Sequence, residues 1–267
     1  MLTIQHVYKT FNQGTVNEKK VISNLNLHLA PGDFATIIGG NGAGKSTMLN
    51  LIAGVFPCDN VAGSSILLDG VNVTRQPEYK RAQLLGRVFQ DPMMGTAADM
   101  EIQENLAMAY RRGKRRSLRW GITKQEKRIF HEKLKTLGLG LETCMTMKVG
   151  LLSGGQRQAL TLLMATLKQP KLLLLDEHTA ALDPKTAQNI LSLTDEIVTR
   201  ESLTALMVTH NMRDAIRYGN RLIMMNEGKI ILDISGEDKK RLSVEDLLEK
   251  FGSASGSELV NDRMLLN

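Results

Sequence analysis

The segment GGNGAGKS at residues 39–46 constrains the fold of this chain more than any other feature. It fits the pattern G-x-x-x-x-G-K-[ST] and lies between an apolar run, Phe34–Ile38, and the sequence STMLNLIAG, whose apolar spacing predicts a helix that ends at Gly54. Glycines allow the tight turn that directs successive N–H groups at a phosphate, and the helix N-terminus adds partial positive charge. We therefore predict a phosphate-binding loop in which Lys45 contacts the β and γ oxygens and the Ser46 hydroxyl binds Mg²⁺.

Length and composition are those of an ordinary globular protein. Of the 267 residues, 42% are apolar and 23% are charged, so the chain has enough apolar residues for a sizeable core in one or two domains and is not disordered. Apolar runs such as Leu172–Leu175 are far shorter than the roughly 18 to 20 residues of a membrane span. Because the N-terminus has no apolar signal segment and the cysteines are only Cys58 and Cys144, a reducing cytosol is the expected compartment. The net charge of +6 fits nucleic acid, an anionic membrane surface or a phosphate ligand.

The order of strand-like and helix-like segments predicts a mainly parallel α/β sheet with a helical insert. Alternating apolar residues at 2–7 and 21–29 predict an antiparallel β region at the start of the chain. Helix-forming residues dominate from Asp91 to Leu167 and include an amphipathic helix that starts after Thr123 and ends at Gly138. The remaining predicted elements are a buried strand in KLLLLDE, a helix at 186–199, a strand at 203–208, a hairpin at 221–234 and a last helix at 244–251.

Two adjacent carboxylates, Asp176 and Glu177, close the buried strand in KLLLLDE. Parallel sheets place ligand-binding residues at the carboxyl ends of their strands, and adjacent residues there point in different directions. One residue of such a pair can bind a metal ion while the other activates water for hydrolysis of a phosphate. We predict that Asp176 holds Mg²⁺ through its water shell and that Glu177 polarises the water that attacks a γ-phosphate.

The sequence Leu152-Ser153-Gly154-Gly155-Gln156 resembles the LSGGQ signature of ATP-binding cassette (ABC) ATPases. It lies between the phosphate loop and the Asp-Glu pair, in the order of that family. The other family motifs are also present, and the resemblance extends from residue 1 to about residue 235. Gln90 in VFQDP resembles the Q-loop glutamine, Asp183 in ALD the D-loop aspartate, and His210 in MVTHN the switch histidine.

The resemblance implies the fold class, α/β, with a P-loop NTPase (RecA-like) core, an N-terminal antiparallel β region and an inserted helical subdomain. A single ABC ATPase domain is expected over residues 1–251. Its core and β region are expected at 1–90 and 166–235, the helical subdomain with the signature at 91–165, and a C-terminal helix at 236–251. Residues 252–267, rich in Ser and Gly, are expected to be a flexible tail.

The resemblance also implies a set of site residues for ATP and Mg²⁺. Glu177, His210 and Gln90 are the expected catalytic residues, and Ser46, Gln90 and Asp176 are the expected metal ligands. An adenine-stacking role is implied for Phe11, with Tyr8 as the competing aromatic residue. The remaining nucleotide contacts are expected at Gly39, Gly40, Asn41, Gly42, Ala43, Gly44, Lys45, Ser46, Thr47, Ser153, Gly154, Gly155, Gln156 and Asp183.

The implied partners follow from the way this family works. Two copies of the chain are expected to pair head to tail around ATP, so that Ser153 and Gly155 of one copy donate to the γ-phosphate held by the other. A separate integral membrane permease and an extracytoplasmic substrate-binding protein are the further expected partners, with no nucleic acid. The chain is then expected to lie at the cytoplasmic side of the cell membrane as a peripheral subunit. The alternative is a soluble ABC ATPase that acts on ribosomes or DNA.

Two features depart from the family pattern or fall outside it. The family commonly has Asp-Glu-Pro-Thr where this chain has His178 in DEHTAALDPKTA, a motif that resembles a bacterial subgroup serving uptake systems. We interpret His178 as a neutral filler in preference to a pH-sensing group. The second feature is a basic segment with three competing interpretations: a solvated face, contact with anionic lipid or a membrane subunit, and nucleic-acid binding. It consists of Arg111, Arg112, Lys114, Arg115, Arg116 and Arg119.

Overall fold

The computed structural model describes residues 1–113 and 121–255. The chain divides into two compact units, each treated separately below: unit 1 contains Met1–Arg81 and the described residues from Ser202 onward, and unit 2 is Ala82–Glu201. Of the basic segment, Lys114, Arg115, Arg116 and Arg119 lie outside the described residues. The flexible tail was expected at 252–267, but residues 252–255 belong to the last helix, Val244–Ser255, and the remainder lies outside the described residues.

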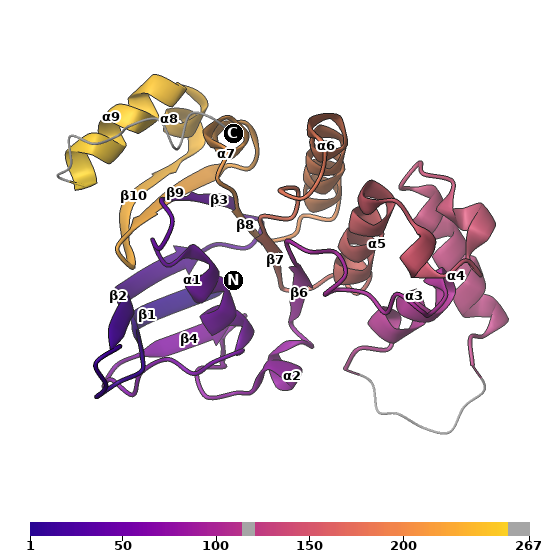
Figure 1. Ribbon diagram of the computed structural model, residues 1–267, viewed down its shortest axis with the longest axis horizontal. Coiled ribbons are helices and arrows are strands. Elements are labelled where there is room, and N and C mark those ends of the chain that lie inside the picture. Colours follow the sequence, from indigo (N-terminus) through magenta and orange to yellow (C-terminus); the bar gives the residue numbers. More distant parts are fainter. Residues whose placement is uncertain (114–120, 256–267) are drawn as a thin grey trace. The chain divides into compact units, whose positions relative to one another are not determined.

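An antiparallel sheet forms one part of unit 1, in the strand order β2-β1-β4-β5. Figure 1 shows β1 between β2 and β4. Leu2 and Ile4 are buried as their alternation predicts, and Val7 is buried as well because the strand register shifts between Ile4 and Val7. The strands are β1 Leu2–Phe11, β2 Lys19–Leu29, β4 Ser65–Leu68 and β5 Val71–Asn72. The predicted N-terminal antiparallel β region is confirmed.

A second set of strands in unit 1 is mainly parallel. The central strand β3 (Phe34–Ile38) is buried over its whole length and pairs in parallel with β8 (Ala205–Val208) and β9 (Arg221–Asn226). The last strand, β10 (Lys229–Ser235), forms the predicted hairpin with β9. The helices of this unit are α1 Lys45–Ala53, α2 Glu78–Arg81, α7 Met212–Arg217, α8 Gly236–Lys240 and α9 Val244–Ser255.

Unit 2 combines one pair of parallel strands with the helical insert. The strands β6 (Leu85–Val88) and β7 (Leu172–Asp176) are parallel, and Val88 is paired with Leu175. The α-helices are α3 Ile102–Tyr110, α4 Lys124–Lys135, α5 Gly154–Thr166 and α6 Pro184–Arg200, with short 3-10 helices η1 at Leu141–Cys144 and η2 at Val149–Leu151.

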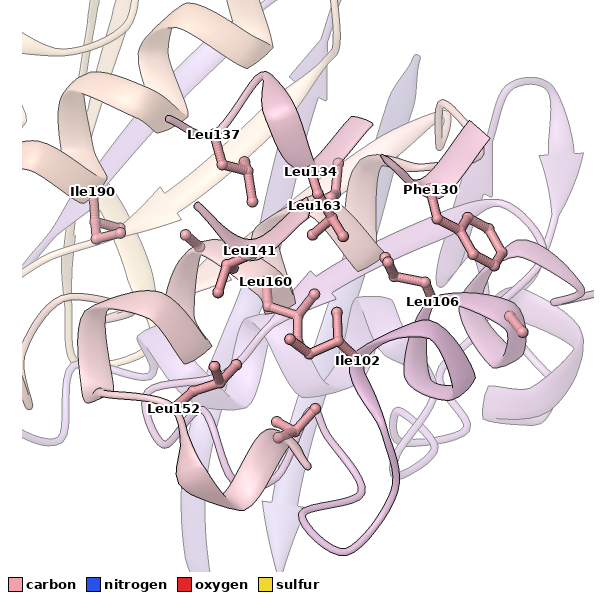
Figure 2. Close-up of a cluster of buried hydrophobic side chains, with 13 residues drawn as sticks. Ile102, Leu106, Phe130, Leu134, Leu137, Leu141, Leu152, Leu160, Leu163 and Ile190 are labelled. Atoms are coloured by element: carbon pink, nitrogen blue, oxygen red, sulfur yellow. The ribbon is translucent and has the colours of Figure 1, made fainter. Parts of the chain in front are cut away.

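A buried apolar cluster holds the helices of unit 2 together. Figure 2 shows side chains from several helices directed at the same interior, among them Leu106 of α3, Phe130 of α4 and Leu160 of α5. Ile190 of α6 belongs to the same cluster. Helices that bury one apolar face in this way are stabilised mainly by that burial, at roughly 25 cal/mol per Å² of apolar surface. The cluster therefore fixes α5 and α6, the two helices whose N-termini carry the predicted signature and D-loop residues.

The sequence missed several short elements of this fold. Thr123 caps α4 as predicted, but the helix ends at Lys135, before the expected Gly138. The strands β4, β5 and β6 and the helices α2 and α7 were not predicted, because each has too few residues for a periodic pattern. The single C-terminal helix expected at 236–251 is instead two helices, α8 and α9. Within residues 1–113 and 121–255, none of the helices combines the length and the apolar character that crossing a membrane requires.

Candidate functional site

The predicted phosphate loop of unit 1 connects β3 to α1. The strand ends at Ile38, and the helix begins at Lys45 with Gly44 as its N-cap residue. The Lys45 ammonium lies across the loop, because Nζ donates to the carbonyl oxygens of Gly39 at 2.7 Å and Gly40 at 3.2 Å. Lys45 is 7% exposed, whereas Ser46 is exposed at the start of the helix. The loop thus places a glycine-rich backbone, the Lys45 ammonium and an exposed serine at one helix N-terminus, which is the arrangement that binds phosphate.

Neighbouring backbone leaves no room for a side chain at the first residue of the loop. Gly39 has φ 155°, and a Cβ added there would lie 2.2 Å from the carbonyl oxygen of Met225 in β9. The β9–β10 turn supports the loop a second time, since the Gly228 N–H donates to the Ala43 carbonyl at 3.0 Å. Glycine at position 39 is therefore a steric requirement of the loop.

Arg81 fixes the other end of α1, a role that the sequence did not reveal. The residue is 2% exposed, and its guanidinium donates to the Leu51 and Ile52 carbonyls at the end of the helix, at 2.7 and 2.9 Å. It also donates to the carbonyls of Gln76 at 2.8 Å and Thr74 at 3.1 Å. Burial lowers the pKa of Arg81 from its ordinary value. A cation at the C-terminus of a helix satisfies its last carbonyls and opposes the helix dipole.

His210 and the phosphate loop follow neighbouring parallel strands of unit 1. Ile37 of β3 is paired with Val208 of β8, so the loop and His210 both lie beyond the carboxyl ends of these strands. Hydrogen bonds hold the residues on both sides of His210. The Thr209 N–H donates to the Ile37 carbonyl at 3.0 Å, and the Asn211 side chain caps α7. His210 itself is exposed. The structure therefore places the predicted switch histidine at the sheet edge that carries the loop.

Phe11 lies at the end of β1 and is half-buried. Its ring meets the ring of Phe56 edge to face, with the centroids 5.3 Å apart. The ammonium of Lys9 lies over both rings, 5.2 Å from the Phe11 centroid and 5.8 Å from that of Phe56. The role of Phe11 in stacking on adenine stays a prediction.

In unit 2 the predicted carboxylates and Gln90 also follow neighbouring parallel strands. Because Val88 is paired with Leu175, Gln90 and Glu177 occupy equivalent places beyond β6 and β7. Arg87, which the sequence did not single out, reaches the carboxylate of Asp176, with Nη2 and Oδ2 3.7 Å apart. Its guanidinium also lies over the ring of Phe89, 4.5 Å from the centroid.

The residue after the predicted base is fully enclosed. His178 is 1% exposed, and its Nε2 lies 3.1 Å from Oγ1 of Thr194 in α6. Burial lowers the pKa of His178 to about 4, so the imidazole is neutral at pH 7. Glu177 itself has φ 44°, a left-handed backbone conformation that residues other than glycine rarely adopt.

The predicted signature and D-loop residues cap two helices of unit 2. Ser153 caps α5: its Oγ accepts from the Gln156 N–H at 3.3 Å, and the Gln156 side chain accepts from the Ser153 N–H at 3.1 Å. Because this cap uses a lone pair of the Ser153 hydroxyl, its proton is available to an anion. Asp183 caps α6 through the Thr186 N–H at 3.1 Å, and hydrogen bonds from the side chain and the backbone of Thr186 lower the pKa of Asp183.

Three predicted ligands for Mg²⁺ have the chemistry that this ion prefers. The hydroxyl of Ser46, the carboxylate of Asp176 and the amide of Gln90 all supply oxygen. In the described part of the chain, no three His, Cys, Asp or Glu side chains form a group suited to a metal ion. Mg²⁺ is usually held by one or two protein oxygens together with phosphates and water, so the residues present fit an ion that arrives with a nucleotide.

A family model and individual relatives both match this chain to ATP-binding proteins of ABC transporters. The family model described as ABC transporter matches residues 22–180. The tyrosine transport ATP-binding protein of Clostridioides difficile (strain R20291) is 44% identical over 251 residues, which are 94% of this chain and 98% of that protein. The thiamine import ATP-binding protein ThiQ of Yersinia pseudotuberculosis is 33% identical over 209 residues, which are 78% of this chain and 82% of that protein.

Two solved structures of an ABC transporter cassette have a similar fold. The dimeric structure of MJ0796, a bacterial ABC transporter cassette, has a TM-score of 0.74 and 27% identity, covering 88% of this chain and 98% of that chain. A dimeric post-hydrolysis state of the same cassette, bound to ADP and Pi, has a TM-score of 0.73 and 25% identity over the same shares of the two chains.

Proposed function

The chain belongs to the ABC transporter family, and from this premise we propose that it drives solute uptake through a membrane permease formed by a separate chain. One observation carries the proposal: the similarity to the tyrosine transport ATP-binding protein extends over 98% of that protein. As a member of this family, the chain is an ATPase that binds ATP. Cassettes of the family dimerise and act with membrane permeases, as peripheral subunits.

The assigned roles of individual residues are part of the proposal. Lys45 and the loop N–H groups bind the β- and γ-phosphates, and Glu177 polarises the attacking water. His210 holds the γ-phosphate and the water in place. Ser46, Asp176 and Gln90 would hold Mg²⁺, which would supply positive charge next to the transferred phosphoryl group. Hydrolysis then depends on Glu177, whereas binding depends on the loop.

The proposed dimer uses the N-termini of two helices. Ser153 is the N-cap residue of α5 and Gly155 lies in its first turn, where helix N–H groups have no acceptor within the helix. We assign these donors to a γ-phosphate bound by a second copy of the chain. ATP therefore joins the two copies, and its hydrolysis separates them.

The proposed assembly lies at the cytoplasmic side of the membrane and includes an extracytoplasmic substrate-binding protein. The relatives named above have transport or import in their names, and their solutes are tyrosine and thiamine. Since this chain carries the ATPase and the permease carries the solute path, the identity of the solute has to be measured on the assembly. The similarity to the tyrosine transport ATP-binding protein makes aromatic amino acids the first solutes to test.

The experiment is an affinity purification of the tagged Glu177→Gln chain with Mg-ATP from detergent-solubilised native membranes. Glu177→Gln is expected to bind ATP, to lose turnover and to accumulate as a dimer. Recovery of a polytopic membrane protein together with a substrate-binding protein would support the proposal. The matched control is the Lys45→Ala Glu177→Gln chain, which should not form the ATP-bound dimer. Recovery of ribosomes or DNA-associated proteins without a membrane chain would overturn the proposal in favour of the soluble alternative.

A further inference from the structure

The buried His178 has no assigned part in the proposed hydrolysis, although it directly follows the proposed base. It comes between Glu177 and the D-loop, at the position where the family commonly has proline. The side chain is 1% exposed and faces α6, where its partner Thr194 is completely buried. A polar side chain enclosed to this degree is retained only where its hydrogen bonds are satisfied.

The direction of the buried hydrogen bond follows from counting protons. The Thr194 hydroxyl has one proton, and it donates that proton to the carbonyl of Ile190 at 2.7 Å. Its contact with His178 must therefore run the other way, with the imidazole Nε2–H donating to Oγ1 at 3.1 Å. This fixes the neutral imidazole as the Nε2–H tautomer. Thr194 in turn is tied to the backbone of α6, so the histidine is anchored to a helix held by the apolar cluster of unit 2.

The backbone of Glu177 explains why a histidine differs from a proline at position 178. Glu177 has φ 44°. A residue that precedes proline is driven towards an extended backbone, and a left-handed conformation at a residue such as glutamate has an energetic cost that the surroundings must offset. Histidine does not impose the restriction that proline imposes, and its buried hydrogen bond supplies a fixed point immediately after Glu177.

We propose that His178 is a positioning residue that holds the Glu177 backbone, and with it the catalytic carboxylate, through the hydrogen bond to Thr194. This role rests on the proposed function, because it requires Glu177 to act in ATP hydrolysis. In the family a rigid proline ring commonly occupies this position, whereas here the hydrogen bond from His178 to Thr194 attaches the backbone to α6. The anchor acts on the hydrolytic step, since neither His178 nor Thr194 belongs to the phosphate loop that binds ATP.

Matched substitutions at Thr194 test this role. Thr194→Val keeps the shape of the side chain and removes the acceptor, whereas Thr194→Ser keeps the hydroxyl. We expect Thr194→Val to lower kcat at least tenfold with ATP affinity unchanged within twofold, and Thr194→Ser to retain kcat within about threefold. His178→Leu should lower kcat to the same extent, and His178→Leu Thr194→Val should fall no further than either single variant, because both remove one interaction.

A second pair of variants covers the case in which Thr194→Val does not fold. His178→Gln can place a donor near the position of Nε2, so it should recover part of the kcat that His178→Leu loses. Thermal unfolding of every variant separates loss of fold from loss of positioning. Unchanged kcat in Thr194→Val and His178→Leu, with normal hydrolysis in the unmodified chain, would overturn the positioning role alone. Absence of ATP hydrolysis in the unmodified chain, or full hydrolysis in Glu177→Gln, would overturn the proposed function and this role with it.

Discussion

Gly155 of the signature faces Thr186 of α6 at a separation that admits no side chain: a Cβ on Gly155 would lie 2.4 Å from Cγ2 of Thr186. Thr186 is also the residue whose N–H donates to the Asp183 cap. The contact therefore joins the start of α5 to the start of α6 within unit 2. Residues assigned to the γ-phosphate and to the D-loop are supported by the same threonine.

The first prediction concerns this contact. Gly155→Ala should destabilise the protein by about 1–3 kcal/mol through overpacking, offset by up to about 1 kcal/mol because alanine favours a helix more than glycine does. In the Thr186→Ser background, which lacks the clashing methyl group, Gly155→Ala should no longer destabilise. Urea unfolding of the four chains measures the difference. Gly121→Ala is the control, since a Cβ there meets nothing within 4 Å. An equal effect of Gly155→Ala in both backgrounds would contradict the contact.

The second prediction concerns nucleotide binding by the phosphate loop. Lys45→Ala should weaken ATP affinity by about 10- to 100-fold, because a hydrogen bond to a charged group contributes about 1.5–3 kcal/mol. The measurement is titration with a fluorescent ATP analogue, with thermal unfolding to verify the fold. Lys135→Ala, on the exposed last turn of α4, should leave affinity unchanged. Unchanged affinity in Lys45→Ala would disprove the assignment of the loop.

The third prediction concerns the buried guanidinium at the end of α1. Arg81→Met leaves the carbonyl oxygens of Leu51, Ile52, Thr74 and Gln76 without this donor, so we expect a loss of at least about 3 kcal/mol in the free energy of unfolding. Arg75→Met, a change at an exposed arginine, should stay within about 0.5 kcal/mol. Urea unfolding compares the two variants. A similar small effect in both would show that Arg81 does not stabilise the helix end.

Much of the fold follows from the sequence where a pattern is long or strongly apolar. The predicted strand Phe34–Ile38 is β3 residue for residue, and the predicted start of α4 after Thr123 is confirmed by its capping box. The strand β6 was missed because its sequence, LGRV, contains a glycine and an arginine and has no strand pattern of its own. It forms because the apolar β7 supplies a parallel partner.

In the candidate site, too, residues that belong to a local motif were predictable, whereas residues that act through distant contacts were not. The phosphate loop is a short motif with a local geometry, so the sequence placed it before the helix that it opens. The signature was recognised from its five residues, and the structure shows that it caps α5. The contacts of Arg81 and Arg87 depend on carbonyls and a carboxylate that are distant along the chain, and no local pattern marks them. His178 was interpreted as a neutral filler, and the structure adds what the sequence could not contain, its buried hydrogen bond to Thr194.

The last prediction follows from the low pKa of His178. Burial lowers it to about 4 in the folded protein, whereas the ordinary value of 6.5 applies to the unfolded chain. Between pH 6.5 and 4 the unfolded chain binds more protons at this site than the folded protein does. The free energy of unfolding should therefore decrease as the pH is lowered, by about 3 kcal/mol over the whole interval. The measurement is urea unfolding at pH 7.5, 6 and 5, without nucleotide and magnesium. The difference in stability between the unmodified chain and His178→Gln should become smaller as the pH is lowered, because the other titrating groups are common to both chains. A constant difference between the two chains would mean that His178 already accepts a proton in the folded state.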